Sequence, residues 1–253
     1  MRELQEGLPK THAEVEAVAV DQGLRRYMLG IYGKVGLGLV LAAGVASATA
    51  GVPALRDLLF TTVTQGGGAP RVALTFAGAL VAFAPLVLLL SAGGVLSRPT
   101  PARTGALYWS VVTLIGASLG VLFLTFTGLS IALTLAVSAL GFGALSLIGY
   151  TTTRDLAGVG GFLLMGLVGL VASLAANLVL RSPAIDYVTG VAGVLIFAGL
   201  IAYDSQRLKL AYHQLGGDES SMAVATDLGA LSLFINFVNL FQLLLMMVSG
   251  QRR

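Results

Sequence analysis

Long runs of apolar residues without a charge dominate the pattern along this chain. A helix crosses the hydrocarbon core of a bilayer, about 30 Å thick, with roughly 20 apolar residues. Seven runs approach or exceed this length and predict seven transmembrane helices, at residues 35–51, 72–96, 105–127, 129–150, 157–180, 187–203 and 228–249. The first helix can begin as early as Tyr27 if Lys34 extends its ammonium group to the lipid headgroups, and Pro85 is expected to kink the second.

The third and fourth helices are predicted from one continuous stretch. Residues 104–153 contain no charged residue, and this stretch is longer than a single span requires. A turn near Gly128 divides it into two helices joined by almost no loop. The predicted fold class is therefore an all-α integral membrane protein with a single helical domain at residues 27–253. Residues 1–26 are polar and mixed in charge, and we expect a flexible segment there.

The composition indicates that lipid is the solvent of this protein. Hydrophobic residues make up 56% of the chain and charged residues only 11%, which leaves too few polar groups to cover a water-soluble surface. The formal charge of +3 comes from basic residues in loops, so it indicates topology and not a nucleic-acid partner. The chain has no cysteine, and its two histidines, His12 and His213, lie outside the predicted spans. We therefore expect no enzyme, no resident cofactor and no metal site of high affinity.

The distribution of basic residues predicts the orientation, because Lys and Arg favour cytoplasmic loops. With the N-terminus in the cytoplasm, nine Lys and Arg residues fall on the cytoplasmic side and five on the other side. A cytoplasmic N-terminus is therefore predicted. Seven crossings would place the C-terminus outside, unless the last segment re-enters the membrane instead of crossing it.

Small and polar residues of the seventh span lie on one face of the predicted helix. At about 100° per residue, five of them fall within an arc of roughly 140°. They are Gly229, Ser232, Asn236, Asn239 and Gln242. Unsatisfied amides in hydrocarbon cost several kcal/mol, so we expect this stripe to face protein or water at the centre of the bundle. Two interpretations stay open, namely hydrogen bonds that only join helices and a polar pathway lined by Ser232, Asn239 and Gln242.

Asp204 is the acidic residue of greatest interest, at the end of the sixth predicted span. An ionisable residue at membrane depth is costly, so it indicates a function and a partner. Asp204 shares a helix face with Phe197 and Leu200 and is expected to point inward, toward Asn236. The alternative is a carboxylate at headgroup level that pairs with Arg207. Five other acidic residues are expected in or beside solvated loops, namely Asp155, Asp186, Asp218, Glu219 and Asp227.

Three segments of the sequence resemble motifs of the Bax inhibitor-1 family, also called transmembrane Bax inhibitor motif proteins. Residues 197–207 read Phe-Ala-Gly-Leu-Ile-Ala-Tyr-Asp-Ser-Gln-Arg, and residues 229–241 read Gly-Ala-Leu-Ser-Leu-Phe-Ile-Asn-Phe-Val-Asn-Leu-Phe. Residues 143–156 read Gly-Ala-Leu-Ser-Leu-Ile-Gly-Tyr-Thr-Thr-Thr-Arg-Asp-Leu. The chain is similar to bacterial members from about Asp21 to its C-terminus.

This resemblance implies six helices around a hydrophobic seventh, in the plasma (inner) membrane of a bacterium. It implies a calcium leak gated by a pH-sensing pair of aspartates, of which the first corresponds to Asp204. A basic residue after the second span, here Arg98 or Arg103, is implied as a partner of the sensor. A bacterial branch of the family binds and restrains a membrane-bound ATP-dependent protease, and its N-terminal tail takes part. Protease regulation through residues 1–26 is therefore the alternative function.

The second aspartate of the family pair is replaced by Asn236 in this sequence. Two neighbouring carboxylates share a proton and titrate together, which an Asp and Asn pair cannot do. We therefore expect a proton sensitivity that is shifted from that of the family. One carboxylate also attracts calcium more weakly than two, so a leak of Ca²⁺ or another cation is expected instead of a high-affinity calcium site.

Overall fold

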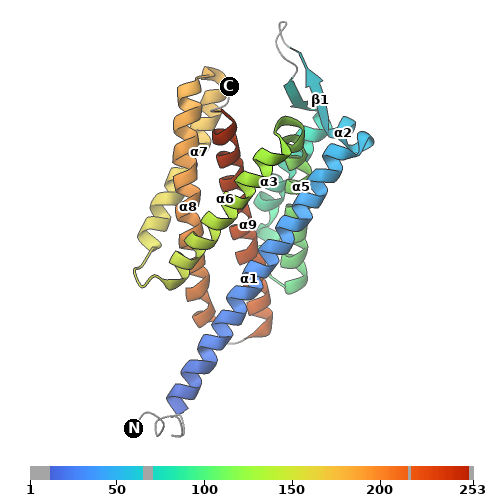
Figure 1. Ribbon diagram of the computed structural model, residues 1–253. Coiled ribbons are helices and arrows are strands. Elements are labelled where there is room, and N and C mark those ends of the chain that lie inside the picture. Colours follow the sequence, from blue (N-terminus) through green and yellow to red (C-terminus); the bar gives the residue numbers. More distant parts are fainter. Residues whose placement is uncertain (1–11, 65–70, 216–217, 251–253) are drawn as a thin grey trace.

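The computed structural model describes residues 12–64, 71–215 and 218–250 and consists mainly of long helices (Figure 1). In chain order the elements are α1 (His12–Gly51), α2 (Pro53–Leu59), β1 (Phe60–Val63), β2 (Arg71–Leu74), α3 (Phe76–Ser91), α4 (Gly93–Ser97), α5 (Pro101–Thr125), α6 (Gly128–Thr151), α7 (Ala157–Leu180), α8 (Pro183–Gln214) and α9 (Glu219–Gly250). Seven segments within these residues are long and apolar enough to cross a membrane. The prediction of an all-α membrane protein with seven transmembrane helices is therefore confirmed.

The tight turn between α5 and α6 lies where the uncharged stretch predicts it. α5 ends at Thr125, and α6 begins at Gly128. The hydroxyl group of Thr127 accepts a hydrogen bond from the backbone N–H of Ser130 at 3.2 Å. This cap satisfies one of the free N–H groups in the first turn of α6, so a new helix starts without a long loop.

The second span begins later than predicted, because residues 72–74 belong to a β-hairpin. Strand β1 pairs antiparallel with β2, with Phe60 opposite Leu74. The side chain of Thr75 accepts a hydrogen bond from the N–H of Gly78 at 3.0 Å, and this cap starts α3. A continuous apolar run therefore contains both a strand and a helix, separated by a capping threonine.

The second span also contains a break in the helix. α3 continues through Pro85, the residue at which the sequence predicts a kink. The interruption lies at Ala92, between α3 and α4, directly before Gly93 and Gly94. Glycine is a poor helix former, which explains a break at this point. Together α3 and α4 form the span Phe76–Ser97.

Three helices extend beyond the apolar runs that predict them. α1 begins at His12, inside the segment for which the sequence predicts flexibility, and Leu24 is buried in the core. Residues 1–11 of that segment lie outside the described residues. α8 continues to Gln214, so Asp204 lies within this helix and not at its end. α9 begins at Glu219, so Asp227 also lies inside a helix.

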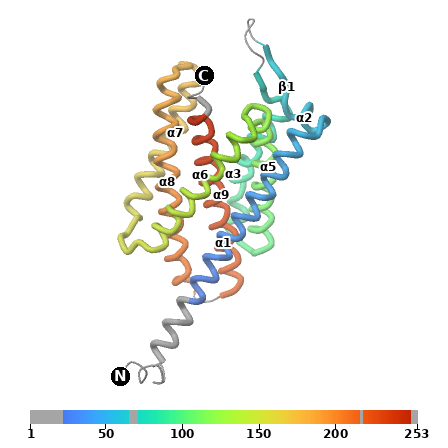
Figure 2. The backbone as a smooth tube through the Cα atoms, in the orientation of Figure 1, coloured from blue at the N-terminus to red at the C-terminus, as the bar shows by residue number. Residues whose placement is uncertain are grey.

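α9 packs against four of the other spans, α1, α5, α6 and α8. Figure 2 shows α9 between α8 on one side and α5 on the other. α3 packs mainly against α5, and α7 packs against α8. The implied arrangement of six helices around the seventh is therefore not confirmed, because α3 and α7 are outer helices of the bundle.

The side chains of α9 are buried on several faces, which accounts for its position. Phe234 and Leu245 have no exposed surface, and Phe237 is 2% exposed. The ring of Phe234 meets Tyr108 of α5, and the ring of Phe237 meets Phe142 of α6. A helix that is apolar on most faces belongs in the interior of a bundle.

The outer helices expose large apolar side chains. On α7, Leu178 is 79% exposed and Val179 is 83% exposed, and Phe76 at the start of α3 is 82% exposed. An apolar surface along whole helices is unfavourable in water, whereas lipid acyl chains solvate it. The exposed surface thus agrees with a position in the bilayer.

Close approaches between helices depend on glycine at two points. A Cβ atom on Gly149 of α6 would lie 2.1 Å from the carbonyl oxygen of Ala202 of α8. A Cβ atom on Gly116 of α5 would lie 2.8 Å from the Cα atom of Ala42 of α1. Small residues permit such backbone contacts between membrane helices, where no hydrophobic effect drives association.

Candidate functional site

The candidate site lies where α8 faces α9. The residues Gly193, Phe197, Leu200 and Asp204 recur at helical spacing on α8, and all four are buried. This is the face that the sequence predicts to point inward. Asp204 is 4% exposed, so its carboxylate lies in the interior of the bundle.

The carboxylate of Asp204 accepts hydrogen bonds from two side chains of α9. The Nδ2 atom of Asn236 donates to Oδ2 of Asp204 at 2.8 Å, and the hydroxyl group of Ser232 donates to the same oxygen. The contact expected between Asp204 and Asn236 is therefore present. Ser232 and Asn236 stand one helical turn apart on α9, which places both donors on the side that faces α8.

The other carboxylate oxygen forms an ion pair within α8. The Nη2 atom of Arg207 lies 3.1 Å from Oδ1 of Asp204. The Arg207 side chain is 52% exposed, so the guanidinium reaches from the buried acid toward the helix surface. Its guanidinium carbon also lies 5.8 Å from the ring centre of Tyr203. Asp204 therefore has three donors, and its charge is balanced by one neighbouring cation.

The two other basic residues proposed as partners lie elsewhere. Arg98 and Arg103 are exposed and flank the start of α5. The Nη1 atom of Arg103 donates to the backbone carbonyl of Arg98 at 3.4 Å. Of the three basic residues that the sequence nominates, Arg207 is the one that the structure pairs with Asp204.

The polar stripe of α9 divides between two neighbours. Ser232 and Asn236 face Asp204, whereas Asn239 and Gln242 line a pocket of about 190 Å³ beside α5, together with Ser118. The side-chain amide of Asn239 donates to the backbone carbonyl of Ile235 at 2.9 Å. The lining of this pocket does not include Asp204. The stripe therefore both joins helices and contributes polar groups to a small pocket whose lining is mostly apolar.

A second buried carboxylate, which sequence reasoning missed, lies on α9. Asp227 is 5% exposed, although its place in the sequence predicts a position in or beside a solvated loop. Its Oδ1 atom pairs with the ammonium group of Lys34 of α1, and its Oδ2 atom accepts a hydrogen bond from Thr104 of α5 at 2.7 Å. Lys34 therefore points to an acid in the bundle and not to the headgroups. The expectation of a solvated carboxylate is correct for Asp155, Asp186, Asp218 and Glu219, which are exposed.

Aromatic residues complete the surroundings of Lys34. Its ammonium group lies 5.2 Å from the ring centre of Tyr108 and 5.8 Å from that of Trp109. The hydroxyl group of Tyr108 donates to the backbone carbonyl of Lys34 at 2.6 Å. The presence of a lone Lys in the first apolar run is the signal that could have predicted an acidic partner, because charges at membrane depth pair with one another.

Asp227 and Asp204 connect α9 to different helices, on different sides of α9. Asp227 and Ser232 are five residues apart, which corresponds to about 7.5 Å along the helix and about 140° around it. Asp227 thus binds α1 and α5 on one side, and Ser232 binds Asp204 of α8 on another side.

Gln206, two residues after Asp204, holds the loop between α6 and α7. Its Nε2 atom donates to the carbonyl of Arg154 at 2.7 Å, and its Oε1 atom accepts from the N–H of Leu156 at 2.8 Å. Lys209 donates to the carbonyl of Tyr150 at 2.8 Å. One segment of α8 therefore provides the acid for α9 and the polar contacts for the loop after α6.

The site contains one carboxylate, one amide and one hydroxyl group as potential oxygen donors to a cation. Among the residues that the structure describes, no three His, Cys, Asp or Glu side chains come together as a metal-binding group. What the arrangement offers is a single buried carboxylate of α8 that two donors of α9 contact.

Comparison with known proteins assigns the family. The model of the family described as "Inhibitor of apoptosis-promoting Bax1" matches residues 24–253. The chain is 55% identical to an uncharacterized protein of Caulobacter vibrioides, over 93% of this chain and 92% of that protein. It is 40% identical to the inner membrane protein YbhL of Escherichia coli, over 91% of this chain and 94% of that protein. It is 33% identical to an uncharacterized membrane protein of Streptococcus pyogenes, over 87% of this chain and 91% of that protein. With this coverage and these seven spans, the chain belongs to the Bax inhibitor-1 family of multi-pass membrane proteins.

Proposed function

We propose that this protein is a passive cation leak pathway that closes at the contact of Asp204 with α9. The observation that supports it is a carboxylate, 4% exposed, held by Asn236 and Ser232 of the neighbouring helix. Acidic groups inside membrane proteins are rare and mark ion pathways and proton relays. Calcium is the cation favoured by the family resemblance.

In this proposal the described conformation is the closed state. All three donors of Asp204 are engaged, and Arg207 balances its charge. A cation that reaches Asp204 must displace Arg207 and bind the carboxylate in its place. Protonation of Asp204 removes the charge that holds Arg207 and weakens both hydrogen bonds from α9, so it loosens the contact between the two helices.

The replacement of the second family aspartate by Asn236 changes the expected response. A pair of carboxylates shares one proton and gives a coupled titration, whereas Asp204 has an amide in that position. We expect a shallower dependence of the leak on pH than a two-aspartate site gives. Calcium prefers six to eight oxygen ligands, so the few oxygens here favour passage over tight binding.

The test is calcium flux into liposomes that contain the purified protein, measured with a trapped indicator over a series of pH values. The wild-type protein is expected to leak, and Asp204→Asn is expected to abolish the pH dependence. Asn236→Asp is expected to steepen it. Asp155→Asn, which neutralises an exposed carboxylate on the loop after α6, serves as the matched control and should leave the profile unchanged. A steep acid response that survives in Asp204→Asn, or wild-type flux equal to that of empty liposomes, contradicts the proposal.

The alternative function is regulation of a membrane-bound ATP-dependent protease. It is supported by the mixed charge of residues 1–26, which precede the first apolar run. Deletion of residues 2–20 keeps the span that begins at Gln22. If the alternative is correct, this deletion abolishes co-purification of the protease from bacterial membranes and leaves ion flux intact. Unchanged co-purification after the deletion contradicts it. Neither proposal includes a catalytic step or a resident cofactor.

A further inference from the structure

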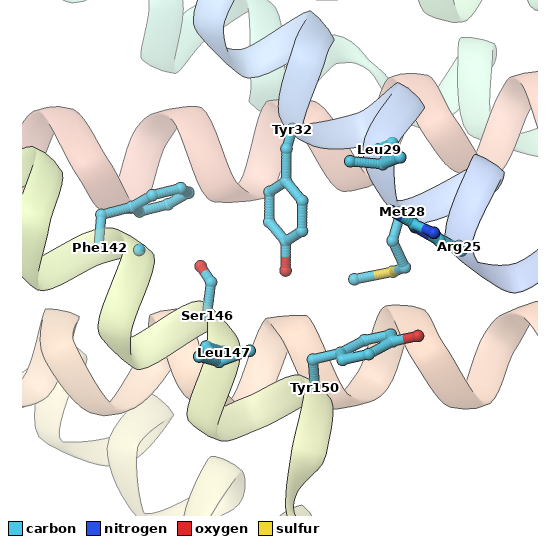
Figure 3. Close-up of a pocket in the computed structure, with 9 residues that line it drawn as sticks. Arg25, Met28, Leu29, Tyr32, Phe142, Ser146, Leu147 and Tyr150 are labelled. Atoms are coloured by element: carbon cyan, nitrogen blue, oxygen red, sulfur yellow. The ribbon is translucent and has the colours of Figure 1, made fainter.

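A pocket of about 460 Å³ opens between α1 and α6 (Figure 3). Residues of α1 and of α6 line it, namely Arg25, Met28, Leu29, Tyr32, Phe142, Gly143, Ser146, Leu147 and Tyr150. In the described part of the chain these two helices make little direct contact with each other, although both pack against α9. The pocket is therefore a gap in the wall of the bundle, and Leu29 and Leu147 of its lining expose large apolar side chains at the protein surface.

The interior of the pocket is mostly apolar, but it contains an unused hydroxyl group. Ser146 is 4% exposed, and its Oγ atom has no hydrogen-bond partner. Figure 3 shows this oxygen and the hydroxyl group of Tyr32 pointing into the space between α1 and α6. Buried hydroxyl groups normally have a partner. The Ser146 hydroxyl group is therefore a free donor beside the wall of the pocket, although its oxygen has almost no accessible surface in the described conformation.

One end of the pocket is positively charged. Arg25 of α1 lies there beside Tyr150, near the C-terminal end of α6 (Figure 3). Lys209 of α8 donates to the carbonyl of Tyr150, and its ammonium group lies 5.6 Å from the ring centre of that residue. Arg25 is the cation that lines the pocket, so an anionic group at this end would meet its guanidinium, whereas the deeper part offers apolar contacts.

We propose that this pocket binds an anionic phospholipid, with one acyl chain between α1 and α6 and the phosphate at Arg25. Arginine binds phosphate oxygens in bidentate fashion and is the usual residue for such recognition. If the Ser146 side chain turns toward the pocket, its hydroxyl group can donate to an ester oxygen of the lipid. The bilayer supplies this ligand at high local concentration, so the site fills without a soluble partner.

The size of the pocket favours a lipid acyl chain over a transmembrane helix as its occupant. An α-helix with side chains is about 10 Å wide, so about 460 Å³ corresponds to roughly one helical turn. A transmembrane helix of a second copy cannot enter it, whereas a flexible acyl chain can. The charged end of the pocket agrees with this assignment, because a phospholipid carries its charged headgroup at one end of its acyl chains.

The occupant would touch a residue that contacts the neighbourhood of Asp204. The hydroxyl group of Tyr32 lies 3.5 Å from Oγ of Ser205, the residue that follows Asp204. A lipid chain against Tyr32 therefore packs on the contact between α1 and α8. The binding site itself does not depend on whether the protein conducts ions.

Four variants test the proposal with matched controls. Gly143→Leu is designed to occupy the pocket, at a position where a Cβ atom meets no atom within 4 Å. Gly141→Leu is its control, since a Cβ atom at Gly141 also meets no atom within 4 Å and this residue does not line the pocket. Arg25→Ala removes the cation in the pocket, and Arg26→Ala removes its exposed neighbour.

The measurement is native mass spectrometry of each protein after reconstitution with equal amounts of phosphatidylglycerol and phosphatidylcholine. The wild-type protein is expected to retain phosphatidylglycerol. Gly143→Leu should lose the bound lipid, and Arg25→Ala should lower the preference for the anionic lipid about tenfold, the factor expected for a lost charged hydrogen bond. Gly141→Leu and Arg26→Ala should match the wild type, and equal melting temperatures confirm that the variants fold.

Three results overturn the proposal. The first is retention of the same lipid by Gly143→Leu, and the second is equal retention of both lipids by the wild-type protein. The third is a wild-type dimer, detected in the same spectra, that Gly143→Leu dissociates without loss of lipid. That third result would identify the gap as a contact between copies of the chain.

Discussion

The ammonium group of Lys34 pairs with the carboxylate of Asp227 inside the bundle, across 193 positions of the sequence. The side chain of Asp227 is only 7% exposed and that of Lys34 is 21% exposed. The pair joins the first span to the last, and Thr104 of α5 adds a third helix to the contact.

Loss of one partner of this pair leaves a buried charge without its counterion. We expect Lys34→Met and Asp227→Asn each to lower the free energy of unfolding by about 2 kcal/mol. This loss is smaller than the loss expected for a fully buried ion pair, because Lys34 is partly exposed. The double variant should be more stable than the sum of the single effects predicts. Thermal unfolding in detergent measures these differences. Asp57→Asn, which breaks the exposed pair with Arg56, should change stability by less than about 0.5 kcal/mol.

Gln206→Leu is expected to release the loop between α6 and α7. The substitution leaves the N–H of Leu156 and the carbonyl of Arg154 without partners, at a cost of about 1–3 kcal/mol. Hydrogen exchange should show faster exchange at the Leu156 amide. Gln214→Leu, at an exposed position of the same helix, should leave that amide unchanged. Equal exchange in both variants would mean that the loop does not depend on Gln206.

Gly149→Ala should separate α6 from α8. The new Cβ atom would lie 2.1 Å from the carbonyl oxygen of Ala202, so the helices must move apart, at a cost of about 1–3 kcal/mol. Gly141→Ala meets open space and should be neutral or slightly stabilising, because alanine is the better helix former. Melting temperatures of the two variants in detergent compare them directly. Similar values would show that the backbone contact at Gly149 adapts without cost.

Single cysteines can test the predicted cytoplasmic N-terminus, because the chain contains no cysteine. Asp57→Cys lies between the first and second spans, and Asp155→Cys lies between the fourth and fifth. In intact cells with an accessible outer face, a membrane-impermeant maleimide should label Asp57→Cys. It should label Asp155→Cys only after the membrane is permeabilised. The opposite labelling pattern would reverse the orientation.

The pKa of Asp218, a residue outside the membrane spans, depends on the hydrogen bonds at the start of α9. Hydrogen bonds from the Ser221 side chain and backbone hold the pKa of the Asp218 carboxyl below its usual value, with the backbone N–H 2.8 Å from Oδ2. The folded state therefore gains stability at pH values above the ordinary pKa, and loses it as the pH falls through the lowered one. Ser221→Ala should raise the pKa of Asp218, which an NMR titration of the carboxyl carbon measures. An unchanged value would assign the shift to the backbone alone.

The spans were predictable because each is an apolar run near the length that a bilayer requires. The contact of Asp204 with Asn236 was predictable because helical periodicity places each residue on a defined face. The β-hairpin was not, because residues 72–74 are apolar and continuous with the helix that follows Thr75. Length and hydropathy do not distinguish a strand from the first turn of a helix in such a run.

Asp227 escaped prediction for a different reason. Asp227 and its neighbour Thr226 end the polar segment of the sequence, so the residue resembles the edge of a loop. The helix in fact begins at Glu219, and the acid lies about two turns inside it. Whether a charge at the edge of an apolar run faces water or a partner depends on tertiary packing, here on Lys34 of a distant helix.

The anchoring of α9 from two directions divides the protein into two blocks. α1, α3 and α5 form one block, α6, α7 and α8 form the other, and α9 is the joint between them. Asp227 attaches α9 to the first block and Asp204 attaches it to the second, so the two attachments use different residues and different neighbouring helices. The gap between α1 and α6 lies along this joint, and any molecule that enters from the bilayer there meets both blocks at once.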